Sequence, residues 1–234
     1  MEPLAALFKG RHFNHDIITV CVRWYVTYKL SYRDLANMMA ERDIEVAHTA
    51  ILRWVQRYIP AFEKRWCRYA RPLGRSWRID ETYIKVKGQW VYLYRGVDKA
   101  GQPIDFFWSE HRDRAAAQQF WQQATEKRGL PEKLTLAGYA ASHEAIGELQ
   151  QEGILATKLV VRTSKYLKNL SEQDHRRVQQ RVRPMLGFKD FAPAAIPLAG
   201  IELVHQIKKQ QFDVSTLCPA PTRTPQLWEA VLAA

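Results

Sequence analysis

The first third of the chain repeats its apolar residues at helical spacing. Between Asp16 and Tyr28 they recur every three or four positions, which predicts an amphipathic helix. A second helix is expected from Ser31 to about Arg42, because Ser31 and the acidic residue three positions later form an N-cap signal. A third helix is predicted to begin near His48 after a short connection. Its inward face should consist of Ile51, Trp54, Val55 and Tyr58.

Two short helices, a tight link and a basic outer face are typical of a helix-turn-helix motif. In that motif the second helix lies in the major groove, where its first residues contact base edges and later basic residues contact phosphates. Thr49 and Arg53 are the candidates for base contacts. The alternative is a plain helical hairpin with a solvated charged face. The candidate DNA-binding residues in this part are Arg33, His48, Thr49, Arg53, Gln56 and Arg57.

From Trp77 onward the apolar period changes from helical to alternating, which predicts strands. Three consecutive strands joined by Gly-containing turns are expected to form an antiparallel meander. The pattern then alternates between helix and strand, and this order is that of a ribonuclease-H-like domain. The fold class is therefore α/β, with a mixed five-stranded sheet and helices, preceded by an all-α helix-turn-helix domain. The predicted later elements are a helix at 112–127, a strand at 133–139, a helix at 142–153, a strand at 158–164 and a helix at 170–182.

Four segments are expected along the chain. Residues 1–60 form the helix-turn-helix domain and residues 76–211 the ribonuclease-H-like domain. The basic, aromatic segment 61–75 is interpreted as a linker that touches DNA, or alternatively as an ordinary surface helix end. Residues 212–234 are expected to be a loosely held tail, with packing on the core or on a partner subunit as the alternative.

Charge is distributed unevenly along the chain. The net charge is +11; residues 1–75 carry 13 basic and 7 acidic side chains, 76–158 carry 11 and 11, and 159–234 carry 11 and 6. Basic ends around a neutral middle favour a nucleic acid partner, because phosphates attract clustered cations. A basic surface that serves solubility is the alternative. The sequence contains no membrane-spanning apolar run and no signal peptide pattern, and its three scattered cysteines indicate reduced thiols in the cytoplasm.

Acidic residues mark a candidate catalytic centre in the predicted sheet. Asp80 lies midway along the first strand and Glu172 opens the last helix, while position 137, at the end of the fourth strand, is alanine. Two-metal phosphoryl chemistry needs carboxylates at such points, because Mg²⁺ prefers oxygen ligands. Glu81 cannot replace the missing acid, since adjacent strand residues point to opposite faces, and Glu144 is a weak substitute. Taken singly, Asp80 and Glu172 are also compatible with an exposed strand acid and a helix-start charge.

A histidine-based site is less attractive. His143 and His175 show neither metal-ligand spacing nor a nucleophile partner. The sequence therefore favours a carboxylate-based site over a histidine-based one.

The chain resembles the bacterial insertion-sequence transposases of the IS-six family, which carry a DDE catalytic triad. The resemblance covers nearly the whole length and rests on "FKGRHF", "SYRDL", "RWVQRY", "WRIDETYIKVKGQWVYLYR", "GYAASH", "SKYLKNLSEQDHR" and "MLGFK". It implies a helix-turn-helix that binds the terminal inverted repeats of the element, and a ribonuclease-H-like domain that cleaves and joins DNA with Mg²⁺, or Mn²⁺ in its place. It also implies a homo-oligomer, a dimer or higher, in the bacterial cytoplasm, with double-stranded terminal-repeat and target DNA as partners.

Transferred residue by residue, Asp80 matches the first Asp of the triad and Glu172 the Glu, and both are expected to hold the metal. The middle Asp, expected in "LDGYAASH", is Ala137. Two smaller departures are Gln179, where the family usually has a basic residue, and Ala47, where it usually has an acid. Pro197 interrupts a stretch that otherwise looks helical. Further candidate DNA-binding residues are Lys165, Lys168, His175 and Arg176.

Alanine at position 137 predicts a transposase that binds DNA but is catalytically impaired, with Mg²⁺ held weakly. Folding should survive, because removing one acid from a cluster relieves like-charge repulsion. The substitution is compatible with an engineered change and with a drifted gene copy. The alternative function is a non-catalytic DNA-binding repressor, a domesticated copy that occupies the terminal repeats.

Overall fold

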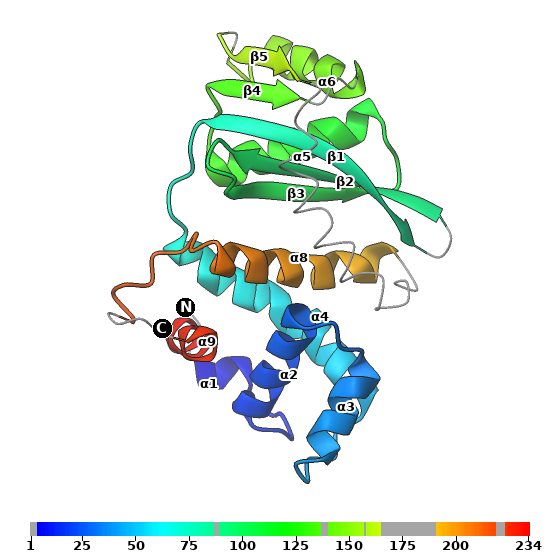
Figure 1. The fold of residues 1–234 in the computed structure, drawn as a ribbon, viewed down its shortest axis with the longest axis vertical. Helices are drawn as coiled ribbons and strands as arrows, with labels where there is room; N and C mark the ends of the chain where they lie inside the picture. Colours follow the sequence, from blue (N-terminus) through cyan, green and yellow to red (C-terminus); the bar gives the residue numbers. More distant parts are fainter. Residues whose placement is uncertain (1–3, 87–88, 137–139, 157, 165–190, 219–222) are drawn as a thin grey trace. The chain divides into compact units, whose positions relative to one another are not determined.

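The computed structural model describes residues 4–86, 89–136, 140–156, 158–164, 191–218 and 223–234. Packing divides them into two compact units. One unit is helical and contains the described parts of Met1–Arg71 and Ala192–Ala234; the other contains the sheet and begins at Pro72. Figure 1 shows the elements of both units. Among the described residues, no helix is long and apolar enough to cross a membrane.

The described part of the helical unit begins with four helices, of which the last three were predicted from the sequence. They are α1 (Leu4–Leu7), α2 (His15–Thr27), α3 (Tyr32–Ala40) and α4 (His48–Trp66), followed by a short 3-10 turn, η1 (Cys67–Tyr69). The predicted N-cap of α3 is confirmed as a complete capping box: Asp34 donates its backbone N–H to the Ser31 hydroxyl, and the Asp34 carboxylate accepts the Ser31 N–H. The predicted inward face of α4 is buried as expected.

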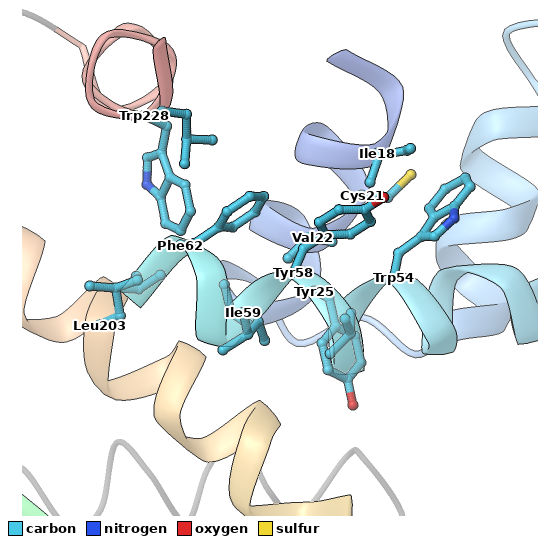
Figure 2. Close-up of a cluster of buried hydrophobic side chains, with 14 of the residues drawn as sticks. Ile18, Cys21, Val22, Tyr25, Trp54, Tyr58, Ile59, Phe62, Leu203 and Trp228 are labelled. Carbon is cyan, nitrogen blue, oxygen red and sulfur yellow. The ribbon is translucent and has the colours of Figure 1, made fainter. Parts of the chain in front are cut away.

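Two C-terminal helices complete this unit. They are α8 (Phe191–Lys208), which continues through Pro197, and α9 (Thr224–Ala233). Gly200 allows α8 to pack closely against α4 and α2, because a Cβ at this position would lie 2.6 Å from side-chain atoms of both Ile59 and Val26. Apolar residues of α2, α4, α8 and α9 share one core cluster, part of which Figure 2 shows.

The expected linker and tail differ from this arrangement. Residues 61–66 lie inside α4, where Phe62 and Trp66 are buried because they face the C-terminal helices. The expectation of a loosely held tail is wrong for α9: its Trp228 is 1% exposed and lies edge-to-face against both Phe62 and Trp66. The Arg65 guanidinium donates to the Leu232 carbonyl over 2.8 Å and fixes the end of the helix.

The sheet unit has the predicted meander. Strands β1 (Ser76–Val86), β2 (Gln89–Asp98) and β3 (Pro103–Ser109) pair antiparallel in sequence order. Strands β4 (Lys133–Leu136) and β5 (Val160–Thr163) extend the sheet on the other side of β1 in parallel, giving the order β3-β2-β1-β4-β5. This mixed five-stranded order confirms the predicted ribonuclease-H-like fold.

One face of the sheet packs on two helices, α5 (Arg114–Arg128) and α6 (Ala140–Gln151). Alternation along β1 directs Trp77 and Ile79 into this core, where they join Phe120 and Trp121 of α5. Figure 1 shows α5 against the meander and α6 beside β4 and β5. The predicted helix at 170–182 lies outside the described residues.

Candidate functional site

Asp80 occupies the middle of β1, as the sequence predicts. Its Cα partner on β2 is Arg95, which is buried, and the Asp80 side chain is half-buried. The Asp80 Oδ1 accepts the backbone N–H of Glu81 over 2.9 Å. Because residues at paired positions of antiparallel strands share a face, Asp80 and Arg95 lie on the same side of the sheet. The carboxylate therefore sits beside a cationic strand residue.

Backbone pairing places the end of β4 beside the residue that precedes Asp80. Leu136, the last residue of β4, pairs with Ile79, the residue before Asp80. Position 137 follows Leu136 directly in the chain but lies outside the described residues, as does Glu172. The meeting of Asp80, Ala137 and Glu172 therefore stays a prediction. The DNA-binding candidates Lys165, Lys168, His175 and Arg176 also lie outside the described residues.

Glu81 points away from the candidate catalytic centre. Its side chain, 8% exposed, accepts hydrogen bonds from the Arg112 Nε over 2.9 Å and from the Ser142 hydroxyl at the start of α6. The Glu81 carboxylate is thus bonded on the face opposite Asp80, as the alternation of the strand predicts. Sequence reasoning missed this link between β1 and α6. No local signal identifies it, because Ser142 is the third residue of α6 and lies 61 positions from Glu81.

The other acid and histidine that were weighed have different surroundings. Glu144 is exposed on α6. His143 Nε2 lies 3.2 Å from the Thr163 hydroxyl of β5, a distance for a hydrogen bond between helix and strand. Across the part of the chain that the structure describes, no group of three His, Cys, Asp or Glu residues could hold a metal ion. The described residues around Asp80 therefore do not by themselves form a metal site.

The predicted helix-turn-helix face lies on α3 and α4. The buried side of α4 holds Ile51, Trp54, Val55 and Tyr58 against the core, so the opposite side faces outward. The candidates Arg33, His48, Thr49, Arg53 and Arg57 are exposed, and Gln56 is half-buried. We call the exposed residues Thr49, Arg53 and Arg57, with Gln56 between them, the outer face of α4.

One departure from the family pattern, Ala47, lies at the start of α4. Ala47 is the N-cap residue of α4, and it makes no side-chain cap hydrogen bond. An acid at this position would accept N–H groups of the first turn, which is the ordinary role of Asp at an N-cap. The first turn of α4 also contains no acidic residue. The first turn of α4 therefore receives no capping hydrogen bond from residue 47, which precedes the exposed His48 and Thr49.

Comparisons with known proteins agree with the geometry. A family model described as a DDE domain, of the IS240 transposase type, matches residues 74–211. The transposase for insertion sequence-like element IS431mec of Staphylococcus aureus is 37% identical over 206 residues, which are 87% of this chain and 89% of that protein. The transposase for insertion sequence element IS257 in transposon Tn4003, also of Staphylococcus aureus, is 36% identical over the same shares.

Among solved structures, the HTLV-2 integrase catalytic core domain in complex with magnesium matches with a TM-score of 0.44 at 15% identity. It covers 68% of this chain and 99% of that one. The match to the DDE domain spans more than half of the chain, and the two transposases align with most of it. The chain therefore belongs to the DDE transposases of bacterial insertion sequences, in the IS-six family.

Proposed function

We propose that this chain binds the terminal inverted repeats of its insertion element through α4, and that its DDE domain is impaired in cleaving and joining DNA as written. The supporting observation is the register of β1 and β4. Asp80 comes one residue after the Ile79–Leu136 pair, so the residue that follows Leu136 is the natural donor of a second carboxylate. That residue is alanine.

Asp80 and Glu172 would hold Mg²⁺, or Mn²⁺ in its place, and Ala137 contributes no oxygen to the set. When bound, the ion supplies activation of water and stabilisation of charge on the reacting phosphate. Asp80 is suited to its part because the Glu81 N–H orients its carboxylate and Arg95 lies on the same face. With one acid missing, the donor set is incomplete and metal affinity should be low.

The DNA-binding part of the proposal rests on the outer face of α4. Thr49 and Arg53 are one helical turn apart and would contact base edges, while Arg57 would contact a phosphate. The opposite face is buried in the core, so the helix is held rigidly while it presents these side chains. We further propose that the chain acts as a homo-oligomer, because two element ends have to be brought together.

The catalytic part is tested by restoring the acid. Strand cleavage and strand transfer are measured with Mg²⁺ or Mn²⁺ on duplexes that carry the inverted repeats flanking the gene, for the chain as written and for Ala137→Asp. The expected result is metal-dependent product only with Ala137→Asp. Adding Asp80→Asn to that variant should abolish the product again. If Ala137→Asp binds the repeats but yields no product, the triad assignment is refuted.

The binding part is tested by removing two cations from the outer face. Arg53→Ala with Arg57→Ala should weaken repeat binding and reduce the slope of log affinity against log salt, by about 0.9 for each lost phosphate contact. The matched control removes two exposed lysines of the sheet unit, Lys99→Ala with Lys158→Ala. Equal binding by both double variants would refute a role for α4.

A non-catalytic repressor is the second candidate function, and Ala137 favours it. Such a chain would occupy the repeats and form mixed multimers with an active relative. Added to an active IS-six transposase with matching repeats, it should lower strand transfer in proportion to its share of the mixture. An unchanged product yield at excess of this chain would exclude the repressor function.

A further inference from the structure

Two large aromatic side chains lie exposed near the tip of the β1–β2 hairpin. Tyr83 of β1 is 55% exposed and Trp90 of β2 is 54% exposed. Their ring centroids are 4.8 Å apart with an interplanar angle of 86°. In such an edge-to-face pair, one ring contributes its edge, so its two faces lie outside the contact between the rings. We call Tyr83 and Trp90 the hairpin aromatic pair.

Trp90 lies on a two-stranded arm, and Tyr83 lies at the base of this arm. The described pairing of β3 with β2 ends at Tyr92, and that of β4 with β1 ends at Ile79. Beyond the Tyr83–Tyr92 pair, β1 and β2 therefore pair only with each other within the described residues. Figure 1 shows this arm projecting past the rest of the sheet. An arm of this kind can enter a nucleic acid groove or separate strands without disturbing the core.

The charge around the arm suits an anionic partner. In the sequence, residues 84–91 of the hairpin contain Lys85 and Lys87 and no acidic residue. Glu81, the nearest acid on the same side of the sheet, is covered and bonded to Arg112. A sequence that combines aromatic residues with lysines and lacks acids has the composition that stacks bases while holding phosphates.

The small area of the pair argues against a protein interface. Each ring exposes about half of the 150–250 Å² that a large aromatic residue can bury, so together they offer roughly 200 Å². A stable protein interface needs about 800 Å² from each partner. A nucleobase matches the exposed area of one or two rings much better.

We propose that the hairpin aromatic pair stacks an unpaired base of the DNA on which the chain acts. This inference rests on the proposed function and adds a site for single-stranded nucleotides to it. Tyr83 lies on the same face of β1 as Glu81, opposite Asp80, because residues 80 and 83 are an odd number of positions apart.

The test compares single-stranded and duplex DNA. Binding of a fluorescein-labelled 25-nucleotide thymidine oligomer and of a blunt 25-bp duplex is titrated with the full chain and with Tyr83→Leu plus Trp90→Leu. Leucine keeps an apolar side chain but removes the ring. The double variant should lose at least fivefold in oligomer affinity, the lower end for stacking of one base at about 1 kcal/mol. Its duplex affinity should change by less than about twofold.

Further variants separate stacking from general damage. Trp90→Phe keeps a ring and should lose less than Trp90→Leu, and Leu130→Ala, which removes another exposed apolar side chain of the sheet unit, should bind both probes normally. An oligomer carrying 2-aminopurine should lose fluorescence on binding the unmodified chain and keep it with Trp90→Leu.

Failure of this inference can be distinguished from failure of the proposed function. If the unmodified chain fails to bind terminal-repeat duplex, the role of α4 fails, whereas the oligomer titration still reports on the hairpin. The inference is overturned if the double leucine variant binds the oligomer as well as the unmodified chain does. It is also overturned if 2-aminopurine fluorescence stays unchanged when the unmodified chain binds the oligonucleotide. The same holds if the double leucine variant abolishes self-association of the protein without changing its affinity for the oligonucleotide.

Discussion

The C-terminal helix α9 should be an integral part of the helical core, and Trp228→Ala tests this most directly. Trp228 is 1% exposed, and its ring centroid lies 5.7 Å from that of Phe62 and 5.8 Å from that of Trp66. Figure 2 shows Trp228 directed at Phe62. Replacing the indole by a methyl group removes both ring contacts and leaves a cavity between α4 and α9.

The loss of stability expected for Trp228→Ala is large. Truncation of a buried Phe or Trp to Ala costs about 3–5 kcal/mol, against a total stability of about 5–15 kcal/mol for a typical domain. For a unit of about 100 residues this corresponds to a fall in Tm of roughly 12 °C or more. Trp228→Phe should cost much less, because a ring remains and the buried indole Nε1 has no hydrogen-bond partner within the described part of the chain.

Urea unfolding followed by circular dichroism measures these changes. Glu229→Ala, an exposed change on the same helix, is the control and should stay within about 1 kcal/mol of the unmodified chain. Repeat binding well below the Tm should survive Trp228→Ala, because the outer face of α4 is nearer the other end of that helix. A loss below about 1 kcal/mol for Trp228→Ala would mean that α9 is the loosely held terminus first expected.

Three further expectations follow from single contacts. Glu81→Ala removes the hydrogen bonds that the Glu81 carboxylate accepts from Arg112 and Ser142. It should lower the free energy of unfolding of the sheet unit in urea by about 2 kcal/mol, because Arg112, which is 38% exposed, regains only part of this hydrogen bonding from water. A change below about 0.5 kcal/mol would contradict this expectation. Hydrogen bonds from Ser31 lower the pKa of Asp34. The stabilising effect of the Asp34 carboxylate is therefore complete above the ordinary Asp pKa of about 3.9 and is lost as the pH falls through the lower pKa of the folded state. The stability advantage of the unmodified chain over Asp34→Asn should shrink between about pH 7 and about pH 3, and a constant difference would exclude this linkage. Burial raises the pKa of the Cys21 thiol to about 11, so Ellman's reagent should modify the exposed Cys67 and the half-buried Cys218 in the native chain and Cys21 only on unfolding. Rapid native modification of the variant that combines Cys67→Ser with Cys218→Ser would contradict the burial of Cys21.

The parts of the fold that were predictable from sequence are those fixed by local periodicity. The three N-terminal helices follow from apolar residues at helical spacing, and the Ser31 cap follows from one residue pair three positions apart. In β1, strict alternation was enough to place Glu81 opposite Asp80, because adjacent strand residues face opposite sides. Periodicity identifies which face of an element is apolar, and these conclusions need nothing more.

The remaining features depend on contacts between distant residues, which periodicity does not identify. The hydrogen bond from Arg65 to Leu232 spans 167 positions, and the sequence near either residue gives no sign of the other. The same holds for Gly200, whose missing side chain matters only because Ile59 and Val26 lie against it. The position of α8 in the helical core and the bond of Ser142 to Glu81 were therefore beyond sequence reasoning, whereas both became plain from packing.

The interactions around position 137 explain why a transposase fold can persist without its middle acid. β1 and β4 are joined by backbone pairs from Ser76–Lys133 to Ile79–Leu136, and these pairs are indifferent to the side chain that follows. On the other side of the sheet, Glu81 joins β1 to α6 through Ser142. Neither connection needs a carboxylate at 137, and if positions 80 and 137 meet as the family triad implies, an Asp there would cost stability through repulsion from Asp80. We therefore expect that the fold places no constraint of its own on keeping the middle Asp, so that only selection for catalysis would maintain it.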